Sequence, residues 1–424
     1  MRNLKDSGIE WIGEIPKSWT ITILSALFSE RKCKNSGLAE NNLLSLSYGN
    51  IVRRNIESNE GLLPASFETY NIIEPGDIVF RLTDLQNDKR SLRTGLCKER
   101  GIITSAYVTL QIRSDDSPRY MHYLFHTYDL CKVFYGMGDG VRQGMNYEDL
   151  KRLRILRPDQ ETQRRIADYL DRKCSQIDTI IAQQQKVIEK LKAYKLSVIT
   201  EAVTKGLNPD VPMKDSGVEW IGEIPEHWQV PKIKYLATIS SGGTPDRSHP
   251  EYWNGSINWA KTGELQNDEL YETEEKITEL ALENSSAKVF SVDTILVAMY
   301  GQGKTRGMTA LLKVPSATNQ ACAGITVYSK DITVNYLWLF LMGAYDAIRE
   351  KANGSGQPNL SGALIADFNV TLPPIEEQRN ICKTVAMRLP HIDSIIKQKE
   401  TIVDKLTAYK KSLVYEVVTG KKEV

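Results

Sequence analysis

The clearest pattern of hydrophobic and polar positions along the chain is a spacing of three and four residues that occurs twice. The first stretch places Cys174, Ile177, Ile181, Gln184, Ile188, Leu191, Lys195, Val198 and Ala202 on one face, and the second does so with Leu389, Ile392, Ile396, Lys399, Val403, Leu406, Lys410, Leu413 and Val417. Such a and d positions, sustained over four heptads, are typical of a coiled coil. We predict an interface made by Ile177, Ile181, Ile188, Leu191, Val198, Ile392, Ile396, Val403, Leu406 and Leu413.

Proline and glycine predict where these helices begin and end. Pro390 is suited to a first helical turn, so we start the second helix there and the first near Cys174. Gly206 and Gly420 are expected at the C-termini. Each helix then has about thirty residues and a length of ~45 Å. Two such helices in one chain pack most simply antiparallel, as a rod with a domain at each end.

Before each helix the pattern changes to short apolar runs between turns. The first segment predicts strands at 78–82 and 102–112, a helix at 119–135 and a Gly-rich loop at 136–144. The second predicts strands at 294–300 and 322–328, a helix at 335–351 and a Gly-rich loop at 353–362. The expected fold class is α+β, with two globular mixed α/β domains separated by two long antiparallel coiled-coil helices.

The chain is also an internal repeat, and we expect a pseudo-twofold arrangement. Residues 5–16 recur at 214–225 with eleven of twelve positions identical, and residues 163–204 recur in related form at 378–419. Four of the seven tryptophans lie in the two copies of this N-terminal box, which suggests a docking segment. We divide the chain into a first domain at 1–157 with its box at 5–19, a helical region at 158–209, a second domain at 210–372 with its box at 214–228, and a helical region at 373–424.

Composition narrows the class of protein. The 424 residues are 41% hydrophobic and 25% charged, enough for two or three soluble domains. No apolar stretch approaches the ~20 residues of a membrane helix, and no signal segment precedes the first box, so we expect a cytoplasmic protein with no membrane partner. Six scattered cysteines without a Cys-x-x-Cys argue against a zinc ribbon and a disulfide framework. A net charge of +1 argues against a uniformly positive surface like that of histones, but it permits DNA binding.

At this point the chain resembles the DNA-specificity subunits of type I restriction–modification systems. The resemblance rests on the box Asp-Ser-Gly-x-Glu-Trp-Ile-Gly-Glu-Ile-Pro-x-x-Trp at 6–19 and 215–228, on the Pro-x-x-Glu-x-Gln pattern at 158–163 and 373–378, and on the segments 241–245 and 354–361. It implies that each domain is a target recognition domain reading one half of a split double-stranded DNA sequence, while the helices set the spacer. It also implies two methyltransferase subunits as partners, with two motor–nuclease subunits as a further possibility, and S-adenosylmethionine, ATP and magnesium bound by those partners.

Base edges in the major groove are read by Arg, Lys, Asn and Gln, and phosphates by Arg and Lys. Basic and amide residues cluster in turns and Gly-rich loops of both domains. The candidate DNA-binding residues are Arg81, Lys89, Arg90, Arg93, Arg142 and Gln143 in the first domain and Lys261, Gln302, Lys304, Arg306, Gln357 and Asn359 in the second. At position 140–144 the first domain departs from the Gly-Ser-Gly-Gln pattern of the second, so equivalent contacts cannot be assigned between them.

Enzyme motifs are incomplete, and we predict no catalytic or metal-binding residue. The run from Gly301 to Thr305 resembles the end of a phosphate loop, but Ala298 stands where that motif has glycine. His122 and His126 share a helix face without evident further ligands. Two alternatives stay open on the residues alone, a non-catalytic coiled-coil adaptor presenting two protein-binding domains and an enzyme with two divergent catalytic domains. A steep loss of DNA affinity with salt would favour DNA recognition over the adaptor.

Overall fold

The computed structural model describes residues 3–56, 64, 66–85, 92–137, 144–301, 303–353 and 359–424. The chain forms two compact units. Unit 1 consists of Met1–Gln185 together with Thr401–Val424, and unit 2 of Lys186–Glu400. Both ends of the chain therefore belong to unit 1. The boundaries between the units fall inside the two long helices.

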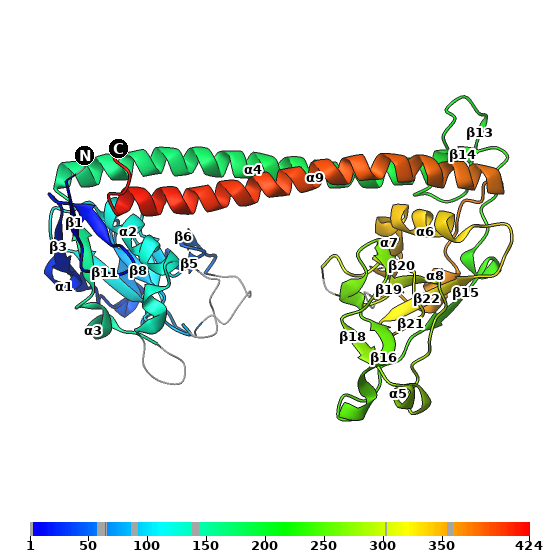
Figure 1. Cartoon of the computed structure of the whole chain (residues 1–424), viewed down its shortest axis with the longest axis horizontal. Coiled ribbons are helices and arrows are strands. Elements are labelled where there is room, and N and C mark those ends of the chain that lie inside the picture. Colours follow the sequence, from blue (N-terminus) through cyan, green and yellow to red (C-terminus); the bar gives the residue numbers. More distant parts are fainter. Residues whose placement is uncertain are drawn as a thin grey trace. The chain divides into compact units, whose positions relative to one another are not determined.

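Unit 1 is built around a four-stranded antiparallel sheet with the order β4 (Phe28–Glu30), β11 (Val108–Ile112), β8 (Ile78–Phe80) and β9 (Thr94–Leu96). Helix α2 (Pro118–Leu130) packs on this sheet through a cluster of aromatic rings, with Phe125 within 5.5 Å of Phe28 and 5.2 Å of Phe80 between ring centroids (Figure 1). These rings are fully buried.

The single strand predicted at 102–112 is two strands. Gly101–Ile103 forms β10, which pairs with β7 (Asn71–Ile73) in a separate two-stranded sheet, and Val108–Ile112 forms β11. A turn separates them, in which the amide of Tyr107 donates to the carbonyl of Thr104 at 3.2 Å. Thr104 and Tyr107, both typical of strands, flank only two turn residues and carry no glycine or proline signal, so the propensity pattern alone hides the turn.

Unit 2 repeats this strand order with one strand added. Its antiparallel strands β15 (Ala237–Ser241), β22 (Cys322–Val327), β19 (Ile295–Ala298) and β20 (Thr309–Leu312) are followed by β17 (Asp268–Leu270), which pairs parallel to β20. A three-stranded sheet of β18 (Glu275–Ile277), β16 (Trp253–Ala260) and β21 (Ser316–Thr318) extends the domain. The helix predicted at 335–351 is broken at Ala344 into α6 (Val334–Gly343) and α7 (Tyr345–Asn353).

Shorter elements complete the two units. In unit 1 they are β1 (Leu4–Asp6), β2 (Glu14–Pro16), β3 (Thr20–Ile23), α1 (Leu24–Leu27), η1 (Ser36–Leu38), β5 (Leu44–Ser47), β6 (Asn50–Arg53), η2 (Val133–Gly136), α3 (Tyr147–Leu150) and β12 (Arg154–Arg157). In unit 2 they are β13 (Met213–Asp215), β14 (Glu223–Pro225), η3 (Ile233–Tyr235), η4 (Pro250–Tyr252), η5 (Thr262–Glu264), α5 (Glu279–Glu283) and α8 (Gly362–Ala366).

The long helices begin earlier than proline placement predicts. Helix α4 is Gln160–Lys205 and helix α9 is Ile375–Val418, so Pro390 lies inside α9 and does not start it. A proline in a helix interior leaves the carbonyl four residues before it without a hydrogen bond. Here that residue is Ala386, and both Ala386 and Pro390 are exposed, so water can reach the carbonyl. Solvent exposure is the reason that the helix tolerates this proline.

The glutamine of the Pro-x-x-Glu-x-Gln pattern anchors the start of each long helix. The fully buried Gln163 side chain accepts from the amide of Ser117, the N-cap of α2, at 2.8 Å and donates to the carbonyl of Pro158 at 2.9 Å. In unit 2, the Gln378 side chain accepts from the amide of Thr333, the N-cap of α6, at 2.8 Å and donates to the carbonyl of Pro373 at 2.9 Å. One amide thus joins the starts of two helices in each unit.

Equivalent tyrosines hold each domain on the last turns of a long helix. In unit 1 the hydroxyl of Tyr120 on α2 donates to the carbonyl of Val418 on α9 at 3.2 Å. In unit 2 the hydroxyl of Tyr336 on α6 donates to the carbonyl of Val203 on α4 at 3.1 Å. Both tyrosines are completely buried.

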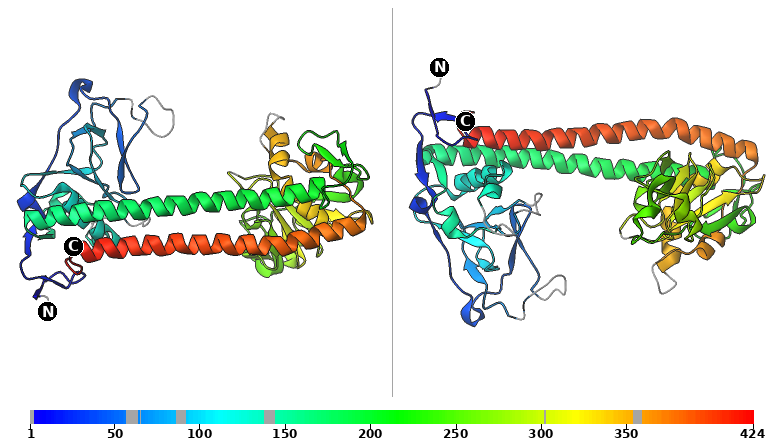
Figure 2. Two further views of the ribbon diagram at one scale, coloured as in Figure 1. Left: turned by 90° about the horizontal axis from the view of Figure 1, so that it is seen from above. Right: turned by 60° about the horizontal axis from the view of Figure 1, so that its bottom comes forward.

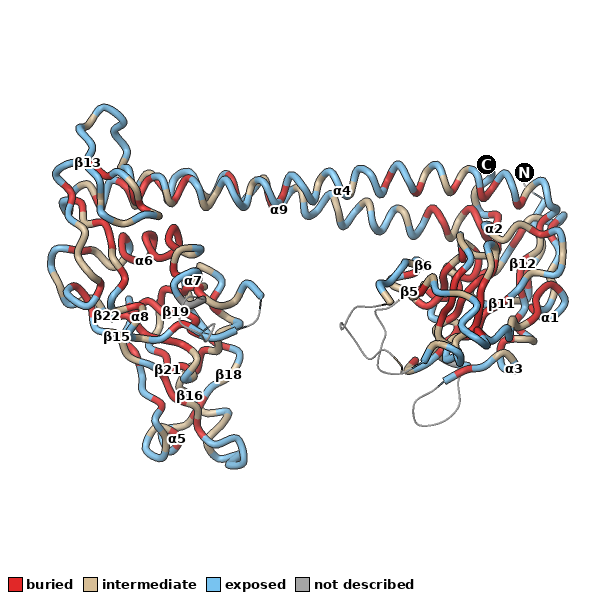
Figure 3. The backbone as a smooth tube through the Cα atoms, turned by 180° about the vertical axis from the view of Figure 1, so that it is seen from behind, coloured by how far each residue is buried: buried red, intermediate tan, exposed pale blue. Residues whose placement is uncertain are grey.

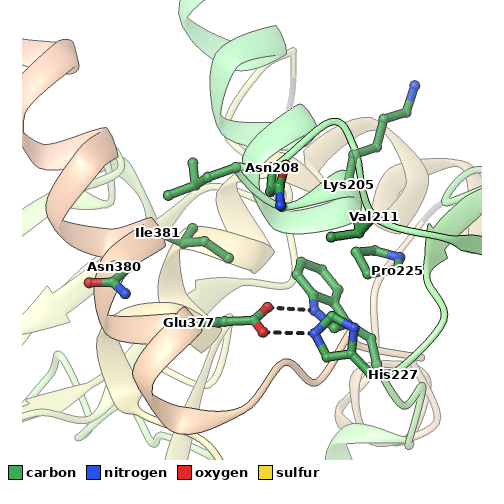
Figure 4. A pocket seen from close by; sticks show the side chains of 11 residues that line it. Lys205, Asn208, Val211, Pro225, His227, Glu377, Asn380 and Ile381 are labelled. Atoms are coloured by element: carbon green, nitrogen blue, oxygen red, sulfur yellow. Dashed lines mark hydrogen bonds and ion pairs between the residues drawn. The ribbon is translucent and has the colours of Figure 1, made fainter.

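The second copy of the tryptophan box closes the end of α4 in unit 2. Strands β13 and β14 form a hairpin, and the buried Trp228 that follows it packs on Gly206, the left-handed residue just after α4. The indole of Trp228 donates to Glu377 in the first turn of α9 at 2.9 Å, and the His227 ring lies 2.7 Å from the other oxygen of the same carboxylate (Figure 4). A hollow of about 260 Å³ remains beside this group.

The first copy of the box closes the end of α9 in unit 1. Its hairpin β1–β2 has the register of the second, and Pro16 and Trp19 pack against the left-handed Gly420. The hydroxyl of Tyr415 donates to the carbonyl of Trp11 at 3.1 Å, and Lys421 Nζ donates to the carbonyl of Ile12 at 2.7 Å. The first and last segments of the chain are therefore packed together.

Within each unit, a part of α4 lies beside a part of α9 (Figure 2). In unit 1 Lys410 forms an ion pair with Asp178 at 2.6 Å, and in unit 2 Lys195 forms one with Asp393 at 2.6 Å. These are the two lysines that interrupt the apolar pattern, and each of them meets an aspartate of the other helix. The ten apolar residues predicted for the interface are all buried or partly buried, while the outer faces of the helices are exposed (Figure 3). In the described part of the chain, no helix combines the length and the apolar character that a membrane crossing needs.

Replacing Glu377 by alanine is expected to destabilise unit 2. The buried Trp228 indole loses its hydrogen-bond acceptor, which costs about 1–3 kcal/mol. Glu376→Ala is the matched control, because the side chain of Glu376 is 77% exposed and its ion pair with Arg379 lies on the surface, where such pairs contribute about 0–1 kcal/mol. Thermal unfolding of the two variants measures the difference, and equal melting temperatures would contradict the anchoring role of Glu377.

Candidate nucleic-acid interface

In the second domain, four loop segments meet at one edge of the central sheet. The amide of Met299, just after β19, donates to the carbonyl of Ala321 at 2.8 Å. The amide of Asn319 donates to the carbonyl of Ala260 at the end of β16 at 3.2 Å, and the amide of Gly243 donates to the carbonyl of Thr318 at 2.8 Å. The ends of β15, β16 and β19 and the start of β22 are therefore tied together by main-chain hydrogen bonds. Such a rigid edge is suited to present loop side chains to a ligand.

Two glycines of the segment 241–245 are required because neighbouring main-chain atoms lie too close to them for a side chain. A side chain at Gly242 would collide with the carbonyl of Thr318, and one at Gly243 with the backbone of Ser286. The carbonyl of Gly243 also accepts from the Trp259 indole at 3.0 Å. The Gly-Gly pair seen in the sequence thus has a packing role in building the edge.

An open groove of about 590 Å³ lies at this edge, and it contains both charges and an aromatic wall. The Arg247 guanidinium stacks on Trp253 at 3.8 Å from the ring centroid and pairs with Glu275 at 2.7 Å. The groove is lined by Thr244, Arg247, Trp259, Lys261, Thr262, Gly263, Glu264, Glu274 and Asn319. Carboxylates beside the cations disfavour phosphates, whereas the mixture of donors and acceptors suits the edges of bases.

Lys261, a predicted DNA contact, lies in this groove and already has two partners. Its ammonium lies 2.9 Å from Glu274 and 3.0 Å from Glu275. Hydrogen bonds with these two carboxylates raise the pKa of Lys261, so the ammonium stays charged and held in the groove wall. A phosphate would have to displace both glutamates.

Lys304 and Arg306 share one loop, and Asn359 lies beside the strand end from which that loop starts. Lys304 and Arg306 lie in the loop between β19 and β20, with Lys304 exposed and Arg306 partly buried. The exposed Asn359 precedes Leu360, whose amide donates to the carbonyl of Met299 at 3.0 Å, so the two segments lie side by side. The segments that contain these three predicted residues both adjoin Met299, whose amide bonds to Ala321 at the edge that carries the groove.

In the first domain, the structure corrects the expectation for Arg93. This arginine is completely buried, and its guanidinium donates to the carbonyls of Arg81, Thr83 and Asp84 at 3.2, 2.8 and 3.1 Å. Its basic character made it a DNA candidate, but a buried guanidinium enclosed by carbonyls cannot touch DNA without unfolding the loop. Arg81 is partly buried, and its amide donates to the carbonyl of Arg93 at 2.8 Å.

The other predicted DNA-binding residues lie outside the described residues. They are Lys89, Arg90, Arg142 and Gln143 in the first domain and Gln302 and Gln357 in the second. Their part in DNA binding stays a prediction.

Sequence reasoning missed several polar residues at the edge of the second domain. Gln320 accepts a hydrogen bond from the Thr244 hydroxyl, and Asn319 and Arg247 line the groove. The sequence could have indicated Asn319 and Gln320, which follow one another between two buried strands, because Asn and Gln side chains match the donor and acceptor pair of adenine. Arg247 carries no such signal, because its stacking partner Trp253 is recognisable only from the fold.

His122 and His126 lie on α2, with ring centroids 6.2 Å apart. Among the described residues, no three His, Cys, Asp or Glu side chains are grouped so that they could hold a metal ion. Burial lowers the pKa of His122 to about 3, and the His126 ring adds to this effect. Burial lowers the pKa of His126 to about 4, and the charges of Lys410 and Lys411 add to it.

These histidines are expected to make unit 1 sensitive to acid. Both are neutral in the folded protein, whereas in the unfolded chain they take up protons below pH ~6.5, so stability is full above that pH and falls as the pH drops toward 4. At pH 5 each histidine is expected to cost about 2 kcal/mol. Denaturant unfolding at pH 7.5 and pH 5 measures this loss. The variant His122→Gln with His126→Gln should lose less stability between the two pH values than the unmodified chain does; an equal loss would refute the assignment.

The fold defines a class: proteins of two mixed α/β units, each of which includes parts of two long helices. Residues 225–408 match the family described as the type I restriction modification DNA specificity domain. The chain is 31% identical to the MjaIX type I restriction enzyme specificity subunit of Methanocaldococcus jannaschii, over 42% of this chain and 41% of that protein. It is 26% identical to the MjaVIII specificity subunit of the same organism, over 76% of this chain and 75% of that protein.

A solved structure gives an independent comparison of the fold. A chain from work on the complex assembly and conformational transition of the type I R-M system superposes with a TM-score of 0.69 at 12% identity, over 96% of this chain and 99% of that chain. At this identity the likeness supports the fold. The sequence matches, by contrast, indicate a type I restriction–modification DNA specificity subunit.

Proposed function

We propose that this chain directs a type I restriction–modification complex to a bipartite DNA sequence, with each domain reading one half. The observation that carries the proposal is the same strand order in two domains whose loops differ. Sheet β4-β11-β8-β9 corresponds to β15-β22-β19-β20. A scaffold that is repeated within one chain and carries different loops is the arrangement expected of a protein that reads two different short sequences with one binding geometry.

We also propose that α4 and α9 form an antiparallel coiled coil related by a pseudo-twofold axis, which sets the spacer between the half-sites. The ion pairs support this arrangement. Asp178 and Asp393 are equivalent positions of the repeat, and so are Lys195 and Lys410. Each aspartate pairs with the lysine of the opposite copy, at 2.6 Å in both units. A reciprocal contact of this kind is what a twofold relation produces.

The long helices carry a second apolar stripe, on which we propose that the methyltransferase subunits dock. On α4 the stripe is Ile180, Val187 and Tyr194, spaced by seven residues and 41%, 38% and 58% exposed. On α9 the corresponding exposed residues are Ile402 and Tyr409, at 40% and 53%. Exposed heptad positions suit a helix of a partner protein. Two copies of one stripe would bind two identical subunits.

In this proposal the chain binds and positions but carries no catalysis. The partners would supply the chemistry, with S-adenosylmethionine on the methyltransferase subunits and ATP and Mg²⁺ on two motor–nuclease subunits where these are present. The chain itself contributes DNA recognition, spacing and docking. The DNA-binding residues proposed for the second domain are Lys304, Arg306 and Asn359, together with the groove that contains Lys261.

Mapping methylated adenine across the source genome, with and without this gene, tests the reading of DNA. We expect one two-part motif with a fixed gap to lose methylation completely on deletion. Unchanged methylation, with the methyltransferase expressed, would favour a protein-binding adaptor instead. In vitro, the affinity of the assembled complex for DNA is expected to fall steeply with salt, because several phosphates are neutralised on binding.

Charge placed on the apolar stripe tests the docking of partners. Tyr194→Glu and Tyr409→Glu are each expected to weaken one methyltransferase site by about 2 kcal/mol, or roughly thirtyfold, as for the loss of a central interface aromatic. Native mass spectrometry should show one subunit bound to each single variant and none to the double variant. Gln185→Glu, an exposed position on the opposite face of α4, adds the same charge and should leave two subunits bound. Two bound subunits in the double variant would exclude this docking surface.

A further inference from the structure

In the second domain, an arginine and a tyrosine of helix α7 bind main-chain carbonyls of the loop between β19 and β20. Arg349 on α7 donates to the carbonyl of Gly303 at 2.8 Å and to that of Arg306 at 2.7 Å. Tyr345, one turn earlier on α7, donates from its hydroxyl to the carbonyl of Lys304 at 2.6 Å. The guanidinium also donates to this hydroxyl at 3.0 Å and lies 5.0 Å from the ring centroid. Three carbonyls of one short loop are thereby bound from a single helix.

The first domain has a similar pair on the corresponding loop, which follows β8. Arg93 donates to the carbonyls of Arg81, Thr83 and Asp84, as described above. Its Nε donates to the hydroxyl of Tyr135 at 3.1 Å, and its guanidinium lies 5.2 Å from the Tyr135 ring centroid. Here the arginine precedes β9 and the tyrosine belongs to η2, so the two pairs are built from different positions of the fold.

Such a pair restricts loops that would otherwise have conformational freedom. The second loop contains Gly301, Gly303 and Gly307 at φ values of 142°, 61° and 86°, which are costly for other residues and give a flexible chain when unrestrained. Ordering each loop residue at the moment of binding would cost about 1–2 kcal/mol. Bonds from a fixed guanidinium to the loop carbonyls remove that cost at the bonded residues beforehand, because their main chain is already in one conformation.

We propose that Arg349 with Tyr345, and Arg93 with Tyr135, are positioning residues for DNA sequence readout, and this inference rests on the proposed function. Each pair fixes the main chain at the bonded carbonyls, within 303–306 in the second domain and 81–84 in the first, so that the side chains there meet base edges in one geometry. The pairs do not touch DNA. They determine discrimination between sequences and leave general affinity for DNA unchanged.

The test uses the complex of the full chain with its methyltransferase partners. Methylation rates are measured on DNA in which each base pair of the target is varied in turn. Arg349→Lys keeps the charge but loses the forked geometry, and Tyr345→Phe keeps the ring but loses the hydroxyl. Both are expected to reduce discrimination roughly tenfold at one or more base pairs of the half-site read by the second domain. The other half-site and the salt dependence of DNA affinity should stay as in the unmodified complex.

Tyr135→Phe should produce the reciprocal result, with relaxed discrimination in the half-site of the first domain alone. It is the milder change there, because Arg93 is completely buried and its replacement threatens folding. Tyr328→Phe is the matched control. It removes the same hydroxyl from a hydrogen bond to a carbonyl, that of Lys234 at 3.0 Å, elsewhere in the second domain, and should change neither half-site.

Three results would overturn the inference. Equal loss of discrimination at both half-sites would indicate a general effect on folding. An unchanged discrimination profile accompanied by a lower melting temperature would show that the pairs are only part of the packing. An equal loss of discrimination with Tyr328→Phe would show that the effect does not depend on the bonds to these loops. An unmodified complex without any two-part preference would instead refute the proposed function itself, and the inference with it.

Discussion

The packing of a buried tryptophan on the glycine that follows a long helix is the interaction on which much of this structure depends. In unit 2, Trp228 closes the end of α4 on Gly206 and reaches Glu377 in the first turn of α9. One side chain therefore fixes the end of one helix against the beginning of the other. The antiparallel pairing of the two helix segments in that unit follows directly from this contact.

The same device in unit 1 is made from the two ends of the chain. Pro16 and Trp19 pack on Gly420, so the first box serves the last helix and the second box serves the first helix. The repeat in the sequence is for this reason offset from the compact units, each of which takes its box and its helix end from different repeats. The position of the unit boundaries inside α4 and α9 has the same origin.

Heptad spacing predicted both long helices and the apolar face that each of them buries, because those signals are local. Their starts were wrong, since Pro390 is tolerated where its missing hydrogen bond faces solvent, and exposure cannot be read from the sequence. Lys304, Arg306 and Asn359 were predicted as loop residues, but the bond that brings their two segments together, between Leu360 and Met299, is tertiary. Arg93 was misassigned because a buried arginine and a DNA-binding arginine carry the same signal. The groove at Arg247 could be found only from the tertiary structure, because residues distant in the sequence form it.

The arginine and tyrosine pairs of the two loops have one further consequence. Their hydrogen bonds to the loops go to main-chain carbonyls, at Gly303, Lys304 and Arg306 in one domain and at Arg81, Thr83 and Asp84 in the other. Every amino acid supplies a carbonyl, so side chains along the loop can be exchanged while its support is kept. New sequence preferences can then arise by single substitutions in evolution, without a new fold for each target.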